Sequence, residues 1–336
     1  MGNQKLTINL VTWNGAKYIP YLFDSLSKQT NKNWSLLVID NNSTDDTVSL
    51  VEIHAPKLGV NFQIIKNNKN FGFAVGHNRA YKMNDAEYIL IINQDLFLAS
   101  DCVEKLVNFL DKNSDAAAVS PRTMRWNFEK NSFTNIIDSL GLKVYHNRRV
   151  VEINTCEIFQ DNLVEPTRKV FGVSGAIAMF SRRAIEQSGY FFDGNFNSYK
   201  EDVDLAYRLN SLGWNSYVLL NVVAYHDRAG FGSKYKNDFF SVQNKQKQSF
   251  LVRYHSYKNH LVVLYKNEYW QNFFLDIPFI VWYELKKFVY CLLFDRAILV
   301  GLKEIKSLWK DLKKQRADMV KSRHVNWKEM RKKIYV

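Results

Sequence analysis

The chain has 336 residues, of which 46% are hydrophobic, so it can form one large core or a core domain with an appendage. Three cysteines without a CxxC pattern (Cys102, Cys156 and Cys291) argue against structural zinc and indicate a reducing compartment. The net charge is +13, and residues 301–336 hold 12 Lys and Arg against 4 acids. A basic end of this kind suits an anionic lipid surface, nucleic acid or a solvated helix face.

The first 120 residues alternate between short apolar runs and helical patterns. The expected strands and helices alternate in the order strand 6–14, helix 18–30, strand 34–42, helix 43–55, strand 62–67, helix from 74, and strand 87–95. Ser43 or Thr44 is expected to cap the second helix. This alternation predicts a parallel, doubly wound, Rossmann-like α/β sheet.

Polar side chains follow all four predicted strands. The clusters are Thr12-Trp13-Asn14, Asp40-Asn41-Asn42, Asn67-Asn68 and Asn93-Gln94-Asp95. Ligands of doubly wound sheets bind beyond the carboxyl ends of the strands, so the four clusters predict one shared polar site. Asn and Asp are also common turn formers, and that alternative stays open.

The second part of the chain is less regular. Residues 122–169 predict a polar excursion with short strands, and a strand with the small residues Gly172, Ser174, Gly175 and Ala176 follows it. Such small residues indicate close approach of a backbone or a ligand. A loop then leads into a helix that begins with Glu201, Asp202 and Asp204, and the next strands end in His226. From about residue 239 the sequence becomes helical, aromatic and basic, which predicts two regions, 1–238 and 239–336.

Seven motifs, in this order, resemble those of the family 2 glycosyltransferases, and most closely the bacterial rhamnosyltransferase-type members. They are "VTWN", "VIDNNSTDDT", "KNNKNFGFAVGHNRA", "LIINQD", "VSGAIAMFSRRAIEQSGYFFDGNF", "EDVDLAYRL" and "AYHDRAG". The resemblance covers roughly residues 5–260. It implies a GT-A fold, that is, a mostly parallel nucleotide-sugar-binding sheet, here with a helical C-terminal appendage.

The resemblance also implies the roles of individual residues. Asp40 would contact the nucleotide base, and the remaining donor-binding residues would be Thr12, Trp13, Asn14, Asn42, Asn70, Gly72, Phe73, Asn78, Arg79, Asn93 and Gln94. Asp202 would be the catalytic base, and Glu201, Asp204 and Gly175 would orient it or bind the acceptor. Asp95 and His226 would bind Mg²⁺ or Mn²⁺. The chain departs from the family where Asn93 replaces the first carboxylate of a DxD motif, and where Lys258-Asn259 replaces an Arg-Asn pair.

These residue types suit an inverting sugar transfer. A divalent cation relieves the charge that develops on a diphosphate leaving group, and a carboxylate accepts the proton of the attacking hydroxyl. We find no dedicated nucleophile for a retaining reaction. A structural alternative stays open for each group. The acids at 201–204 could only cap a helix whose dipole keeps them ionised. Asp95 could be an N-cap, although Ser100 and Asp101 already serve that purpose.

The C-terminal region contains no stretch suited to crossing a membrane, because Glu284, Lys286 and Lys287 interrupt the apolar run 275–300. That run is expected to be buried or to lie in an interface. The apolar residues Leu302, Ile305, Leu308, Trp309 and Leu312 alternate with lysines, which predicts a helix lying on an anionic cytoplasmic leaflet. The alternative is a helical hairpin packed on the catalytic domain or on a second subunit.

We therefore expect a metal-dependent inverting glycosyltransferase of bacterial surface-polysaccharide synthesis. It would move a sugar, best L-rhamnose from dTDP-L-rhamnose, to a hydroxyl of a glycan or a polyprenyl-diphosphate-linked glycan. The protein would be cytoplasmic and peripheral on the inner face of the cell membrane. No nucleic-acid partner is expected, and a homo-oligomer is left open. The alternatives are another UDP-, dTDP- or GDP-sugar, a nucleotidyltransferase, for which "VTWNGAKYIP" has too few Gly and Lys, or a basic nucleic-acid-binding protein, for which no motif appears.

Overall fold

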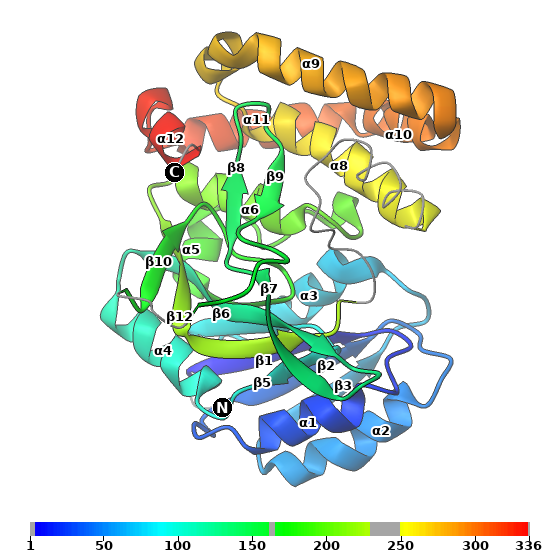
Figure 1. Cartoon of the computed structure of the whole chain (residues 1–336), viewed down its shortest axis with the longest axis vertical. Helices are drawn as coiled ribbons and strands as arrows, with labels where there is room; N and C mark the ends of the chain where they lie inside the picture. The colour runs from blue at the N-terminus through cyan, green and yellow to red at the C-terminus, as the bar shows by residue number, and fades with distance from the viewer. Residues whose placement is uncertain (1–3, 161–164, 229–248, 335–336) are drawn as a thin grey trace.

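The computed structural model describes residues 4–160, 165–228 and 249–334. A mixed, mostly parallel sheet lies between layers of helices, and a group of C-terminal helices packs at one side of it (Figure 1). The predicted α/β class and the helical appendage are both confirmed. The predicted boundary between residues 238 and 239 lies outside the described residues.

The central sheet has the strand order β10-β12-β6-β11-β4-β1-β2-β3, and β5 and β7 pair with β12 and β6. The half formed by β4, β1, β2 and β3 is parallel, whereas β11 runs antiparallel to both of its neighbours. A separate hairpin is formed by β8 and β9. The strands are β1 (Leu6–Thr12), β2 (Ser35–Asp40), β3 (Phe62–Lys66), β4 (Tyr88–Ile92), β5 (Leu96–Leu98), β6 (Ala116–Asn127), β7 (Ser132–Ser139), β8 (Leu142–Val144), β9 (Val150–Glu152), β10 (Thr167–Val170), β11 (Ile177–Ser181) and β12 (Asn215–His226).

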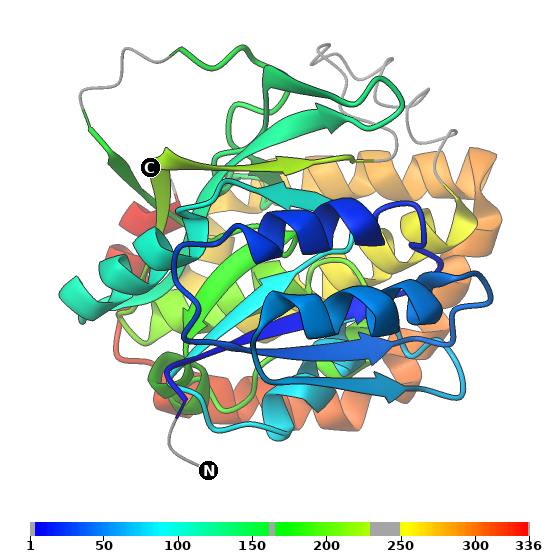
Figure 2. The same cartoon turned by 90° about the horizontal axis from the view of Figure 1, so that it is seen from below.

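Helices cover both faces of the sheet (Figure 2). In β4, Leu90 and Ile92 pack with α1, α2 and α4, whereas Ile89 and Ile91 pack with α3, α5 and α6. Burial on both faces explains why these strands are apolar throughout instead of alternating. The helices of this part are α1 (Ile19–Ser27), α2 (Thr47–His54), η1 (Ala55–Leu58), α3 (Gly72–Lys82), α4 (Cys102–Lys112), α5 (Arg182–Gln187), η2 (Gly194–Phe196) and α6 (Glu201–Ser211).

Two predicted helix caps are wrong. Helix α2 begins at Thr47, after Asp46, and Ser43 and Thr44 instead belong to the preceding loop. In α4 the side chain of Asp101 makes no capping hydrogen bond; the backbone N–H of Val103 donates to the side chain of Gln29, which follows α1. A side chain distant in sequence therefore does what the local sequence seemed to provide.

The small residues at 172–176 were predicted to lie within a strand. The structure places them between β10 and β11 instead. The predicted excursion does contain short strands, the β8–β9 hairpin among them. The turn at 172–176 is tightly packed, because a side chain at Gly172 would place its Cβ 2.5 Å from that of Ala206 in α6. The small residues thus allow this turn to approach the helix that carries Asp202.

The C-terminal helices are α8 (Phe250–Asn267), α9 (Trp270–Phe294), η3 (Arg296–Leu299), α10 (Val300–Ser307), α11 (Trp309–Ser322) and α12 (Trp327–Ile334). They share a core with α6, in which Leu312 is fully buried and Ile305 and Leu308 pack against it. Part of the face predicted to meet a membrane is therefore turned toward α6, whereas Leu302 and Trp309 of the same face are 37% and 40% exposed. No helix in the described ranges combines the length and apolar character that a membrane crossing requires.

Candidate functional site

The loops after β1, β2 and β4 are tied together by neutral hydrogen bonds. The side-chain amide of Gln94 both accepts from the backbone N–H of Trp13 and donates to its carbonyl, each at 3.0 Å. The side-chain oxygen of Asn14 accepts from the backbone N–H of Thr44 at 2.8 Å. The parallel strands thus bring the predicted clusters to one edge of the sheet, as expected.

Asp40 lies inside this edge and is 2% exposed. One of its carboxylate oxygens accepts from the hydroxyl of Thr12 at 2.9 Å, and the other accepts from the backbone N–H of Ser43 at 2.9 Å. Asn41 links the loops further, because its amide donates to the carbonyl of Gly72 at 3.1 Å. Asp40 and Thr12 therefore hold the turn in shape, whatever further contact Asp40 makes with a ligand.

Several predicted donor-binding residues present free surface at this edge. The indole of Trp13 is 53% exposed, and Asn42, with a φ of 63°, and Asn70 lie on the exposed turns after β2 and β3. Asn93 is partly exposed at the end of β4. An exposed aromatic ring among neutral amides can stack on a base and bond a ribose or a diphosphate.

The start of α3 lies close to the loop before α6. Gly72 has a φ of 83°, and a Cβ there would lie 2.5 Å from the backbone oxygen of Asn197, so only glycine fits. Phe73 follows it and packs against His77 and Phe192. Gly72 and Phe73 thus join the edge formed by the ends of β1, β2 and β4 to the loop before α6.

Asn78 and Arg79 are held differently from what was predicted. The amide of Asn78 donates to the carbonyl of Phe192 at 2.7 Å and accepts from its N–H at 3.0 Å. Arg79 donates to the side chain of Asn67. Asn78 therefore holds the segment before α6, and Arg79 supports the end of β3.

Asp95 and His226 lie next to each other, as the metal prediction requires. Nε2 of His226 lies 3.3 Å from Oδ1 of Asp95, and Nδ1 lies 2.9 Å from Oδ2 of Asp138. Burial lowers the pKa of His226, but Asp95 and Asp138 outweigh it and raise the pKa to about 10. The described residues contain no cluster of three or more His, Cys, Asp or Glu suited to a metal. Two protein donors fit a cation whose other ligands come from a bound diphosphate.

A continuous chain of contacts leads from this pair toward Asp202. Asp138 also accepts from Arg228 at 3.3 Å, and Arg228 lies 3.7 Å from Glu152. Glu152 accepts from the hydroxyl of Ser174 at 3.1 Å. Next to Ser174, the N–H of Gly175 donates to Asp202 at 3.1 Å.

Sequence reasoning did not assign roles to Asp138, Glu152 and Arg228. The available signal was one acid in the apolar run "IIDSLGL", since a buried carboxylate needs a partner. Burial raises the pKa of Glu152 to about 7 although Arg228 and Ser139 oppose the shift. Glu152 is therefore able to change its protonation state near neutral pH.

Asp202 is partly buried at the start of α6. Its carboxylate accepts from Gly175 and from the backbone N–H of Val203, at 3.1 and 2.8 Å. Burial nevertheless raises the pKa of Asp202, against the effect of these hydrogen bonds and of the helix dipole. A raised pKa strengthens a carboxylate as a base near neutral pH.

The loop before α6 is strained. Asn197, Tyr199 and Lys200 all have φ between 61° and 75°, which is uncommon for residues other than glycine. Glu201 is 6% exposed, one of its oxygens has no partner within the described part of the chain, and burial raises its pKa well above the usual value. Strain and an unsatisfied buried acid next to Asp202 are typical of a functional site.

Asp204 does not face the site. It is fully buried and accepts from Arg208 at 3.0 Å, Lys266 at 3.0 Å and Asn267 at 2.9 Å. Burial raises its pKa, but these cations outweigh it and lower the pKa. Of the two predicted roles, orienting Asp202 or binding the acceptor, the contacts of Asp204 favour the first, because they fix α6 on α8.

Comparisons with known proteins agree with this geometry. The model of the family described as "Glycosyl transferase family 2" matches residues 7–189. The chain is similar to N-acetylglucosaminyl-diphospho-decaprenol L-rhamnosyltransferase of Mycobacterium tuberculosis, with 23% identity over 266 residues, 75% of this chain and 85% of that relative. It is also 28% identical over 111 residues to poly(ribitol-phosphate) beta-N-acetylglucosaminyltransferase TarS of Staphylococcus aureus, which is 32% of this chain but only 19% of that relative's length.

Solved structures show the same fold. The mannosyltransferase PcManGT from Pyrobaculum calidifontis, in complex with GDP-Man and Mn²⁺, aligns with 95% of this chain and 85% of its own, with a TM-score of 0.52 and 17% identity. Residues 1–349 of TarS, in complex with UDP, align with 91% of both chains, with a TM-score of 0.54 and 16% identity.

Proposed function

Since the chain belongs to glycosyl transferase family 2 and has the GT-A fold, it is a glycosyltransferase, and we propose that it performs a metal-dependent, inverting sugar transfer to a glycan hydroxyl. Membership of this family overrules the alternative activity of a nucleotidyltransferase and that of a basic nucleic-acid-binding protein. The observation that carries the proposal is the chain of contacts from Asp95 and His226 to Asp202.

In this proposal the two ends of the chain of contacts have different tasks. Asp95 and His226 hold a Mg²⁺ or Mn²⁺ ion, which when bound neutralises charge on the leaving diphosphate. A cation there would take the place of the proton on His226, so metal binding releases a proton. Asp202, oriented by Gly175, accepts the proton of the acceptor hydroxyl, and a single displacement inverts the anomeric centre.

The donor is proposed to lie across the ends of β1, β2 and β4. The exposed indole of Trp13 suits stacking on a base, and Asn42, Asn70 and Asn93 offer amides to the ribose and diphosphate. L-Rhamnose from dTDP-L-rhamnose is the proposed sugar, supported by the Mycobacterium tuberculosis relative, whose name also supports a lipid-linked glycan acceptor. Bacterial surface-polysaccharide synthesis is the corresponding process.

The test combines donor binding with transfer. Nucleotide-sugars (dTDP-rhamnose, UDP-N-acetylglucosamine and GDP-mannose) are compared by the rise in Tm with Mn²⁺ and with EDTA, because a ligand stabilises the native state that binds it. We expect the largest rise with dTDP-rhamnose and Mn²⁺. Metal-independent shifts of equal size would contradict the metal site, and a preference for another donor would replace rhamnose.

Asp202→Asn should lower kcat by about 10²- to 10⁴-fold, the usual contribution of a general base, while the donor-induced rise in Tm persists. Asp24→Asn, an exposed acid in α1, is the matched control. Transfer by Asp202→Asn at the wild-type rate would show that the base is another group.

We propose peripheral attachment to a membrane through α9 rather than through residues 302–312. Phe274, Phe279, Trp282 and Leu293 of α9 are each 57–63% exposed, and Lys286 lies 5.8 Å from the ring of Trp282. Exposed aromatics with flanking lysines suit the interface of an anionic bilayer. In Figure 1, α9 forms the outer edge of the helical group.

This attachment is tested by co-sedimentation with phosphatidylglycerol or phosphatidylcholine vesicles. Wild-type protein should bind the anionic vesicles, and Phe279→Gln with Trp282→Gln should reduce binding about tenfold or more, since each ring removes apolar contact. Ile53→Gln, at a similarly exposed residue of α2, is the control. Equal binding of the wild-type protein and the Phe279/Trp282 double variant would contradict a membrane contact through α9.

A further inference from the structure

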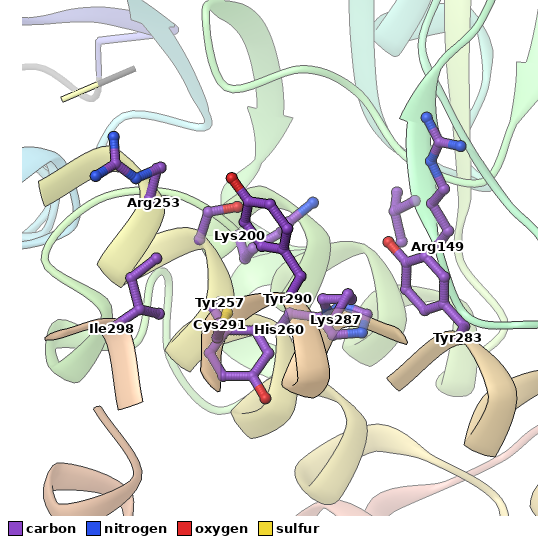
Figure 3. A pocket seen from close by; sticks show the side chains of 12 residues that line it. Arg149, Lys200, Arg253, Tyr257, His260, Tyr283, Lys287, Tyr290, Cys291 and Ile298 are labelled. Carbon is purple, nitrogen blue, oxygen red and sulfur yellow. The ribbon is translucent and has the colours of Figure 1, made fainter. Parts of the chain in front are cut away.

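A cavity of about 130 Å³ lies beside the catalytic helix, where the β8–β9 hairpin, the loop before α6, α8 and α9 meet (Figure 3). Its lining includes Arg149, Lys200, Arg253, His260 and Lys287, together with the hydroxyl groups of one serine and three tyrosines. No Asp or Glu is among the lining residues. In Figure 3, Lys200 and Tyr290 lie at the centre, with Arg149 and Tyr283 on one side and Arg253 on the other.

Two of these cations have counter-ions in contact. Arg253 donates to Asp295 at 2.6 Å, and Lys287 donates to Glu284 at 3.2 Å. His260 lies 2.7 Å from the same Glu284, and burial and Lys287 lower its pKa to about 4, so it is neutral at physiological pH. These three groups form a charge-balanced wall on α8 and α9.

Arg149 and Lys200 differ from the others, because within the described ranges no acceptor lies in hydrogen-bonding reach of either side chain. Arg149 is exposed, whereas Lys200 is partly buried and precedes Asp202 by two residues. Burial lowers the pKa of Lys200, the charges of Asp202, Glu152 and Glu201 act against this, and the charge of Arg149 adds a smaller lowering. The two cations lack a hydrogen-bonded acceptor in the described ranges, so their donor groups are open to an anion that enters the cavity.

The backbone also favours a ligand role for Lys200. Its φ of 75° is a strained conformation for a lysine, which Asn or Gly would adopt more easily. A charged side chain at such a position is unexplained by packing. It is explained if the side chain has to reach an anion while the next residues hold the catalytic base.

Building on the proposed function, we propose that this cavity binds the phosphate or diphosphate group of the acceptor through Arg149 and Lys200. The small volume suits such a headgroup and not a whole glycan. Lys200, two residues before Asp202, lines one side of the cavity and α9 lines another, so a phosphate bound here would link an acceptor hydroxyl near Asp202 to a chain near α9. Arginine and lysine are the usual ligands of phosphate oxygens.

Binding is measured by titration calorimetry with EDTA and without any sugar nucleotide, using farnesyl diphosphate, inorganic pyrophosphate and neutral farnesol as probes. We expect farnesyl diphosphate to bind and farnesol not to bind. Arg149→Gln and Lys200→Asn should each weaken diphosphate binding about tenfold; asparagine is chosen because it tolerates the left-handed backbone. Lys143→Gln, on the same hairpin but outside the cavity, should bind as wild type does.

Tighter binding of farnesyl diphosphate than of pyrophosphate places the phosphate on a lipid, and equal binding places it on a soluble acceptor. In either case, weaker diphosphate binding by both variants supports the site. Binding that neither substitution weakens, or equal binding of farnesol, overturns the proposal. The measurement requires neither donor nor metal, so it is independent of sugar transfer. Transfer that proceeds with an unchanged KM for the acceptor in both variants would refute this site and leave the proposed function intact.

Discussion

Two regions of this protein are held together by different forces: the sheet edge at which we propose donor binding (the donor edge) and the surroundings of α6 (the acceptor side). At the donor edge, hydrogen bonds from neutral groups join the loops, as in the paired bonds between Gln94 and Trp13 and the bonds that Asp40 accepts from Thr12 and Ser43. On the acceptor side, buried ion pairs do so: Lys266 contacts both Asp193 and Asp204, and Arg148 contacts Glu268 and Asp276. This ion network fixes the helix that carries Asp202.

The ion network also makes the C-terminal helices part of the catalytic unit. Asp204 of α6 is bonded to Lys266 and Asn267 of α8, and Asn259 of α8 donates to the carbonyl groups of Ser198 and Tyr199 at 3.0 and 2.7 Å. Residues 249–334 thus position the loop that carries Lys200 and Asp202. The comparison predicts that damage on the acceptor side unfolds the protein, whereas damage at the donor edge weakens donor binding.

The largest effect is expected for Lys266→Met. It would leave Asp193 and Asp204 buried without this cation, which costs about 3–5 kcal/mol of unfolding free energy for a broken buried pair. The measurement is urea unfolding. Lys28→Met removes a pair of which both side chains are about half exposed, and should cost about 0–1 kcal/mol. Equal losses for the two variants would contradict the contrast between the regions.

A smaller effect is expected at the donor edge for Gly15→Ala. A Cβ at this position would lie 2.2 Å from the carboxamide of Gln94, so that side chain must leave Trp13. The KM for the donor should rise about tenfold, which corresponds to about 1.4 kcal/mol of lost binding. In Gly194→Ala the nearest atom would lie 3.7 Å away, and the kinetic constants should not change. An unchanged donor KM in Gly15→Ala would show that this loop does not hold the donor.

The smallest effect is expected for Glu152→Gln, between the two regions. Because burial raises the pKa of Glu152 to about 7, its protonated form is favoured in the folded protein. This stabilisation is present below its usual pKa of 4.5 and is lost as the pH rises through about 7. The Tm of the variant, relative to wild type, should therefore increase between pH 5.5 and 8.5. Parallel Tm curves would show that Glu152 does not titrate in this range.

The donor edge was well predicted from the sequence for a physical reason. Consecutive parallel strands place their carboxyl ends on one edge, so polar residues after each strand must meet, as Trp13 and Gln94 do. The contact of Asn78 with Phe192 was not predicted, because Phe192 is 114 residues away and a helix position alone does not tell which neighbour its amide meets. The ion pair of Asp204 was not predicted for the same reason, since its partner Lys266 lies in a region that has no local link to α6.

The C-terminal helices show the same limit more clearly. Both α9 and residues 302–312 have apolar faces, and the sequence does not say which of the two is covered. The structure buries Leu312 and leaves Trp282 62% exposed. Periodicity thus predicts that a face exists but not what it contacts.

The sequence by itself determined the α/β alternation and the helical end, because strand and helix periodicity are local properties. The acids and the histidine of the candidate site came from the resemblance of its motifs to the family. Only the tertiary structure decided that His226 lies between Asp95 and Asp138, that Glu152 and Arg228 connect this group to Asp202, and that Arg149 and Lys200 share a cavity. Each of these depends on contacts between residues far apart in the chain. Their energies come from burial and from the partner, neither of which is set by the neighbours in sequence.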